Sequence, residues 1–96
     1  MKIDFQKNDD ALKVVLDGRL DTLTAPDLER FLDEKYDGSC ALVFDCEKLS
    51  YISSTGLRVL LTAQKKSNGA MKLANVCELV MEVLEMTGFA DVLVIE

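Results

Sequence analysis

The sequence contains no histidine among its 96 residues. Histidine is the commonest general base in enzymes and a frequent zinc ligand, so its absence excludes Ser-His and Cys-His catalytic pairs and zinc sites of mixed Cys and His ligands. Catalysis would have to depend on carboxylates or lysines. This composition favours a binding protein over an enzyme.

Cysteine is scarce, odd in number and never in C-x-x-C spacing, with Cys40, Cys46 and Cys77 far apart in the chain. We expect these cysteines to be reduced and buried, with no metal, and we expect no cofactor. Methionine is more often a core residue than a binding residue, so we expect Met71, Met81 and Met86 to lie in or near the core.

Long apolar runs and an excess of positive charge are also missing. No stretch approaches the ~20 apolar residues of a membrane span, and the first residues, MKIDFQKNDD, lack the apolar segment of a signal peptide. Seventeen acidic residues against eleven basic ones give a net charge of −6. Because phosphate backbones and anionic lipids would repel such a chain, we expect a cytoplasmic protein without nucleic-acid or membrane partners.

The 49% apolar content supports one domain over residues 1–96, with no linker or repeat. Alternating patterns predict strands over residues 2–7 and 11–17, ended by Gly18. Thr24 as a cap and Pro26 in the first turn predict a helix whose apolar side contains Leu28, Phe31 and Leu32. The apolar run CALVF predicts a central strand covered on both faces, followed by the loop DCEKLSYI.

The second half of the chain predicts two further helices and two further strands. One helix runs from the hydroxyl residues at 53–55 to about Ser67, ends at Asn68-Gly69, and has inward residues Leu57, Leu60, Leu61 and Gln64. The strand AMKLAN, a helix over 77–87 capped by Gly88, and the strand DVLVI follow. The order β-β-α-β-α-β-α-β predicts an α/β domain with a mixed sheet packed with helices.

Three consecutive hydroxyl residues, Ser53, Ser54 and Thr55, stand in the segment YISSTGLRVL. A helix N-cap requires only one of them. Because a helix N-terminus also stabilises anions, it would tolerate a bound phosphate, or a phosphate attached to one of these side chains. The segment therefore predicts a modifiable helix entry.

The helical spacing predicts which residues surround this entry on the exposed surface. Ser54 or Thr55, Arg58, Thr62 and Lys65 face outward if the leucines face inward. Arg58 lies one turn after Ser54, so its guanidinium can reach a phosphate there. Gly56 would let another molecule approach the helix closely.

Carboxylate pairs offer an enzymatic alternative, with Asp45 and Glu47 as the most interesting pair because they precede the hydroxyl residues. A strand end turning into solvent explains this pair more simply. No base is placed to activate a serine, so we interpret the protein as a non-enzyme.

Three segments of the chain resemble a known family. GRLDTLTAPDLE (18–29), VFDCEKLSYISSTGLRVLL (43–61) and LANVCELVMEVLEMTGF (73–89) resemble, in order and spacing, the STAS domains of sulfate transporters and anti-sigma factor antagonists. The likeness extends over nearly the whole chain.

This resemblance implies a bacterial anti-sigma factor antagonist that regulates transcription by partner switching. The implied partner is an anti-sigma factor with serine kinase activity, and a serine phosphatase would reverse the modification. By position in the family motif, Ser54 is the phosphorylated residue and Thr55 the second candidate. The implied partner surface consists of Ser53, Ser54, Thr55, Gly56, Arg58 and Thr62.

Ser53 occupies the position where the family commonly has aspartate, so the negative charge before Ser54 is missing. Two other functions stay open for a STAS domain. One is a protein-binding subunit of an ABC-type lipid transport system, and the other is a ligand-sensing domain that uses the same helix N-terminus.

Overall fold

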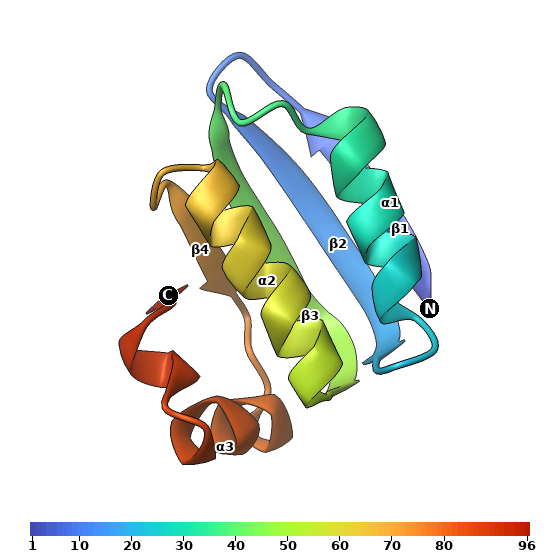
Figure 1. The fold of residues 1–96 in the computed structure, drawn as a ribbon, viewed down its shortest axis with the longest axis vertical. Coiled ribbons are helices and arrows are strands. Elements are labelled where there is room, and N and C mark those ends of the chain that lie inside the picture. Colours follow the sequence, from blue (N-terminus) through green and yellow to red (C-terminus); the bar gives the residue numbers. More distant parts are fainter.

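Helices and strands follow the predicted order in the computed structural model, which describes residues 1–96 (Figure 1). The elements are β1 (Lys2–Lys7), β2 (Ala11–Leu20), α1 (Ala25–Lys35), β3 (Ala41–Ile52), α2 (Ser54–Lys66), β4 (Met71–Ala74), α3 (Glu78–Met86), a 3₁₀ turn (Phe89–Asp91) and β5 (Val94–Ile95). The predicted α/β class is confirmed. No helix is long and apolar enough to cross a membrane.

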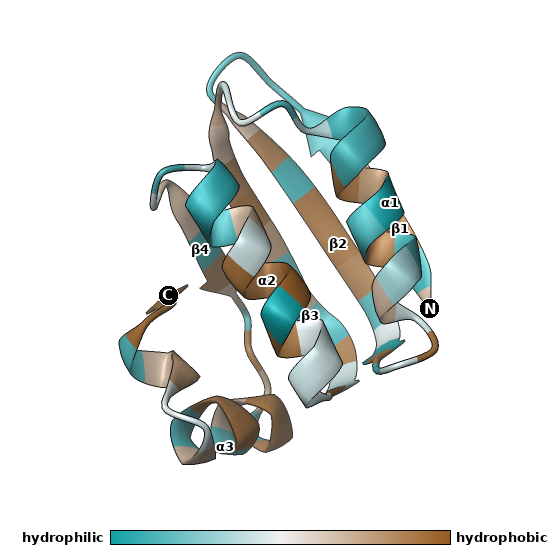
Figure 2. Cartoon of the chain, in the orientation of Figure 1, coloured by the Kyte–Doolittle hydropathy of each residue, from teal (hydrophilic) through white to brown (hydrophobic).

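The five strands form one mixed sheet in the order β1-β2-β3-β4-β5, in which only β1 is antiparallel to its neighbour. β3 is the central strand, as the sequence predicts. α1 and α2 lie side by side along one face of this sheet (Figure 1). A core of 22 buried residues fills the space between the helices and the strands. β2 is largely hydrophobic, whereas α1 and α2 alternate hydrophobic and hydrophilic residues (Figure 2).

The buried side of α2 differs in part from the predicted one. Leu57 and Leu60 are buried as expected, and so are Val59 and Ala63, whereas Leu61 and Gln64 are only half-buried. The reason is that α2 packs against both the sheet and α1, so its buried face is turned toward α1.

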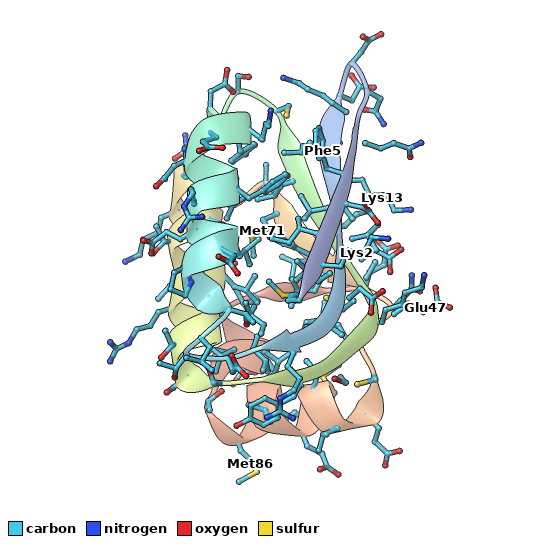
Figure 3. The ribbon with its side chains drawn as sticks, turned by 90° about the vertical axis from the view of Figure 1, so that its right-hand side faces the viewer. Lys2, Phe5, Lys13, Glu47, Met71 and Met86 are labelled. Atoms are coloured by element: carbon cyan, nitrogen blue, oxygen red, sulfur yellow. The ribbon has the colours of Figure 1, made fainter.

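Two expectations for the central strand are wrong. β3 does not end after CALVF but continues to Ile52, because it pairs with β2 along its length, with register shifts between Val15 and Asp17 and between Gly18 and Arg19. The strand is also not covered on both faces. Lys13 and Glu47 project from the side of the sheet opposite α1 (Figure 3).

The C-terminal part also departs from the sequence pattern. The segment DVLVI forms only the two-residue β5, because the 3₁₀ turn takes up its first residue. Gly88 ends α3 with a φ of +82°, as expected of a C-terminal cap. Met71 is buried and Met81 half-buried, but Met86 is 86% exposed, so its assignment to the core is wrong.

Candidate functional site

Ser53 is the N-cap of α2 and is held at three points. Its hydroxyl accepts a hydrogen bond from the Gly56 N–H (3.2 Å), and its carbonyl oxygen accepts one from the Leu57 N–H (2.9 Å). Its own N–H donates to the carbonyl oxygen of Leu20 (2.9 Å) at the end of β2. The hydroxyl of Ser53 is therefore used to start the helix.

Ser54 is the first residue of α2, and its side chain is exposed. Its hydroxyl takes part in no hydrogen bond within the chain, in contrast to that of Ser53. The first turn of α2 contains no acidic residue. Its positive dipole end is thus not neutralised by a side chain, and a negative group on Ser54 would be stabilised there.

Thr55, in the first turn of α2, contacts a loop residue that lies 33 residues earlier in the chain. Its hydroxyl lies 3.4 Å from that of Thr22, in the connection between β2 and α1. The two segments meet because β2 and β3 are parallel and end at the same edge of the sheet (Figure 1). Thr55 is half-buried, so it is less accessible than Ser54.

The expectation that Gly56 admits a partner is wrong. Gly56 is buried, and a Cβ at this position would lie 2.7 Å from Cγ of Leu20 and 2.9 Å from the Leu20 carbonyl oxygen. The missing side chain therefore lets α2 approach the end of β2 within the same molecule.

Arg58 and Thr62 lie on the exposed side of α2, as predicted. Arg58 has no carboxylate within ion-pair distance. The Thr62 hydroxyl donates to the carbonyl oxygen of Arg58 (3.0 Å), so it is occupied within the helix. α2 carries Arg58, Lys65 and Lys66 but no acidic residue, although the whole chain has a net charge of −6.

A rigid loop of residues 21–24, which we call the Asp21 loop, lies beside this helix start. The carboxylate of Asp21 accepts hydrogen bonds from the N–H groups of Leu23 (3.0 Å) and Thr24 (3.1 Å). Desolvation alone would raise the pKa of Asp21, but these N–H groups outweigh it, and the pKa lies below its ordinary value of 3.8. Asp21 is therefore an anion held at the start of α1.

The Thr24 side chain does not cap α1, contrary to expectation. Its hydroxyl donates to the Arg19 carbonyl oxygen (2.7 Å) and accepts from the Asp21 N–H (2.8 Å). The physical reason is that these two bonds occupy the hydroxyl and close the loop on β2, while Pro26, the second residue of α1, has no N–H for a cap to accept.

Thr22 and Leu23 are surface residues beside Ser54 that sequence reasoning did not single out. Thr22 is exposed, and Leu23 is 86% exposed. The available signal was the apolar Leu23 between two threonines, outside the apolar stripe of the following helix.

The carboxylate pair at 45 and 47 does not form a catalytic site with Ser54. Asp45 accepts hydrogen bonds from the Asn75 amide and the Glu47 N–H (both 3.1 Å), and the Asn75 bond is the main reason that its pKa is lowered. Seven residues of strand separate Asp45 from Ile52, which is about 23 Å at 3.3 Å per residue. Asp45 therefore cannot act as a base for Ser54.

The cysteines are all free, as expected. Cys46 is buried, and burial raises the pKa of its thiol to about 12, so this thiol is not a nucleophile at neutral pH. Cys40 and Cys77 are only half-buried, which corrects the expectation of full burial. No group of three or more Cys, Asp or Glu residues is placed to hold a metal ion.

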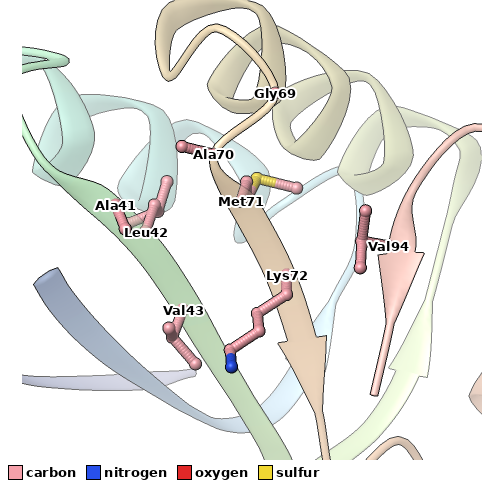
Figure 4. A pocket seen from close by; sticks show the side chains of 8 residues that line it. All are labelled: Ala41, Leu42, Val43, Gly69, Ala70, Met71, Lys72 and Val94. Atoms are coloured by element: carbon pink, nitrogen blue, oxygen red, sulfur yellow. The ribbon is translucent and has the colours of Figure 1, made fainter.

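A shallow depression of about 320 Å³ lies far from the hydroxyl residues. Val43, Lys72 and Val94 contribute side chains to it (Figure 4). Val43 is at the start of β3, whereas Ser54 follows the end of that strand. This depression is thus separate from the Ser54 surface.

Comparison with known proteins places this arrangement in a family. The family model described as STAS domain matches residues 2–96. A Bordetella bronchiseptica protein named "Putative anti-sigma factor antagonist BtrV" is 36% identical over 96 residues, which cover 96% of this chain and 83% of that protein. The anti-sigma-B factor antagonist of Bacillus subtilis is 29% identical over 96 residues, with 97% and 88% covered.

Solved structures agree in fold. An anti-sigma factor antagonist from Mycobacterium paratuberculosis superimposes with a TM-score of 0.86 at 22% identity, covering 98% of this chain and 83% of that one. The antagonist SpoIIAA in its unphosphorylated form gives a TM-score of 0.81 at 16% identity, with 99% and 88% covered. At these identities the likeness concerns the fold, and the family model supplies the assignment. The chain belongs to the STAS domain family.

Proposed function

We propose that this protein is an anti-sigma factor antagonist whose binding to a kinase-type anti-sigma factor is switched off by phosphorylation of Ser54. The two relatives named above support the general role, since one is named "Putative anti-sigma factor antagonist BtrV" and the other "Anti-sigma-B factor antagonist". In this proposal the unphosphorylated protein binds the anti-sigma factor and so frees a sigma factor for transcription. A serine phosphatase restores the binding form.

The observation that carries the proposal is that two neighbouring serine hydroxyls differ in their hydrogen bonds. Ser53 caps α2 through its hydroxyl, whereas the exposed hydroxyl of Ser54 has no partner in the chain. A kinase can reach Ser54 without breaking a hydrogen bond of the fold. Thr55 is the weaker candidate because it is half-buried and contacts Thr22.

The physical basis of the switch is charge at the centre of a contact surface. A phosphoserine adds about −1.5 to −2 charges and three acceptor oxygens. The N-terminus of α2 and the unpaired Arg58 stabilise this charge in the free protein. A partner fitted to a neutral hydroxyl would have to desolvate the phosphate, so binding is lost without a large change of fold.

Ser53 replaces the aspartate that is common at this place in the family. Its hydroxyl supplies the cap of α2, so the helix start does not depend on a carboxylate. A kinase that acts on this protein must recognise a serine preceded by the neutral Ser53. We therefore expect its substrate specificity to differ from that of a kinase whose substrates carry aspartate at this position.

The proposal is tested by affinity capture from the native cell extract with wild-type, Ser54→Ala and Ser54→Asp proteins as baits. Bound proteins are identified by mass spectrometry, and the captured anti-sigma factor is then purified and titrated by calorimetry. We expect wild type and Ser54→Ala to bind it and Ser54→Asp to bind at least about 100-fold more weakly. Incubation with ATP should place phosphate on wild type but not on Ser54→Ala.

Other results would refute the proposal. Equal binding of Ser54→Asp and wild type would remove the switch at Ser54. Capture of a transport ATPase by all three baits would instead identify a constitutive subunit of a lipid transport system, in which the hydroxyl residues serve only to start α2.

A further inference from the structure

We propose that Leu23 is an apolar anchor for the same anti-sigma factor and helps to set which partner is accepted. This inference rests on the proposed function, because it extends the Ser54 surface to the Asp21 loop. It assigns a binding role to a residue outside α2.

The exposure of Leu23 is the first observation. Its side chain is 86% exposed, the same fraction as that of Met86 and more than that of any other large apolar residue. Single exposed leucines are common on protein surfaces, so exposure alone assigns no role. The decisive points are the rigidity of the loop and its place beside Ser54.

The Asp21 loop holds Leu23 in a fixed position. The Asp21 carboxylate accepts hydrogen bonds from the Leu23 N–H (3.0 Å) and from the N–H of the next residue, Thr24 (3.1 Å). The Ala25 N–H also donates to the Asp21 carbonyl oxygen (2.8 Å). The backbone of such a loop loses little conformational entropy when a partner covers Leu23, so the binding cost is limited to ordering the side chain itself.

The loop is fastened to the Ser54 surface from two sides. Thr22, next to Leu23, lies 3.4 Å from Thr55 through the hydroxyl oxygens. Leu20, just before the loop, accepts the hydrogen bond of the Ser53 N–H (2.9 Å). A partner centred on Ser54 therefore meets Leu23 as part of one rigid surface.

The charge of the molecule favours a protein partner over a membrane or a second copy. A net charge of −6 opposes both anionic lipid and self-association. The Asp21 loop and the start of α2 instead present the apolar Leu23, the threonine and serine hydroxyls and, on the exposed side of α2, the unpaired cation of Arg58. This chemistry fits an anti-sigma factor that offers an apolar pocket beside a carboxylate.

The experiment uses the purified anti-sigma factor that wild type captures, titrated with Leu23→Ala, Leu23→Met and Val94→Ala. Val94 is the matched control, since it is 54% exposed and pairs through Lys72 with Val43, nine residues of strand before Ile52 and so about 30 Å away. We expect Leu23→Ala to raise the Kd at least about tenfold, and Leu23→Met and Val94→Ala to change it less than about threefold. Thermal melts check that all variants fold.

The outcomes separate this inference from the proposed function. If Leu23→Ala binds like wild type while Ser54→Asp does not bind, the role of Leu23 is overturned and the Ser54 switch stands. An equal loss in Leu23→Ala and Val94→Ala also overturns it, because the effect is then not local. If both Leu23→Ala and Ser54→Asp bind like wild type, or if wild type captures no anti-sigma factor, both proposals fall.

Discussion

The starts of α1 and α2 lie side by side at the same end of the molecule (Figure 1). The groups that accept hydrogen bonds at the two helix starts are nevertheless different. At α1 the Asp21 carboxylate accepts the N–H groups of Leu23 and Thr24 just before the helix, and Asp27 stands in its first turn, so carboxylates already lie at the positive end of the helix dipole. At α2 only the neutral hydroxyl of Ser53 caps the helix, and no acidic residue stands in the first turn.

This difference shows that the same fold can hold one helix start with its own carboxylate and leave the neighbouring helix start free to accept an anion. A negative group added at α1 would meet the charge of Asp21, whereas one added at Ser54 would meet an unneutralised dipole and Arg58.

The largest effect is expected where the start of α2 packs against the end of β2. In Gly56→Ala, the new Cβ would meet Leu20 at 2.7 Å, and we expect a loss of about 2 kcal/mol and about 10 °C in Tm. Urea unfolding measures the free energy. Arg58→Ala, on the exposed side of the same helix, is the control and should stay within about 0.5 kcal/mol of wild type. Unchanged stability of Gly56→Ala would show that α2 can move away from β2.

Removal of the α2 cap should have a smaller effect. Ser53→Ala loses the hydrogen bond from the Gly56 N–H, and we expect about 1 kcal/mol of destabilisation. Ser53→Gly should lose only a few tenths of a kcal/mol, because glycine leaves the N–H groups open to water. If Ser53→Ala is as stable as wild type, another group caps α2 and the Ser53 hydroxyl is not required as the cap.

A negative charge on Ser54 should stabilise the free protein while it blocks the partner. Relative to Ser54→Asn, we expect Ser54→Asp to gain about 0.5 kcal/mol at low ionic strength. The gain should shrink in 1 M salt, where the Debye length is about 3 Å. Thermal melts at both salt concentrations measure it. A loss of stability in Ser54→Asp would contradict the view that the α2 start accepts an anion.

Acid should reduce the stability that Asp21 contributes at the α1 start, because its carboxylate is protonated at low pH. The folded-state pKa of Asp21 is lowered, so its contribution is complete above the unfolded value near 3.8 and is lost as pH falls through the folded value. We expect the urea midpoint of wild type to fall more between pH 5 and pH 2.5 than that of Asp21→Asn, with Asp9→Asn as the control for one lost charge. Identical pH dependence in wild type and Asp21→Asn would contradict this role.

Much of the fold was predictable because its signals are local. The glycine and asparagine stops, the hairpin turn and the α2 periodicity each depend on a few neighbouring residues, and these elements lie where they were expected. The end of β3 was not predictable, because residues 45–52 are polar in part and become strand only through pairing with β2. The same holds for the predicted strand DVLVI, whose first residue, Asp91, lies in a 3₁₀ turn and of which only Val94–Ile95 forms β5.

The candidate site divides in the same way. Helix spacing identified the hydroxyl residues 53–55 and Arg58, and the resemblance to the STAS family selected Ser54 among them. Sequence reasoning missed Thr22 and Leu23, because their nearness to Thr55 spans 33 residues and depends on two parallel strands that end together. It also misread Gly56, because only packing against Leu20 reveals which side of the helix lacks room.

The order of elements, the family and the hydroxyl residues at the α2 start can be read from the chain alone, since they depend on composition and short-range spacing. The tertiary structure decided which serine is occupied and which is available, and which loop stands beside it. The physical reason is that hydrogen bonds such as Ser53 to Leu20, and the close approach of Gly56 to that residue, exist only after distant strands have paired.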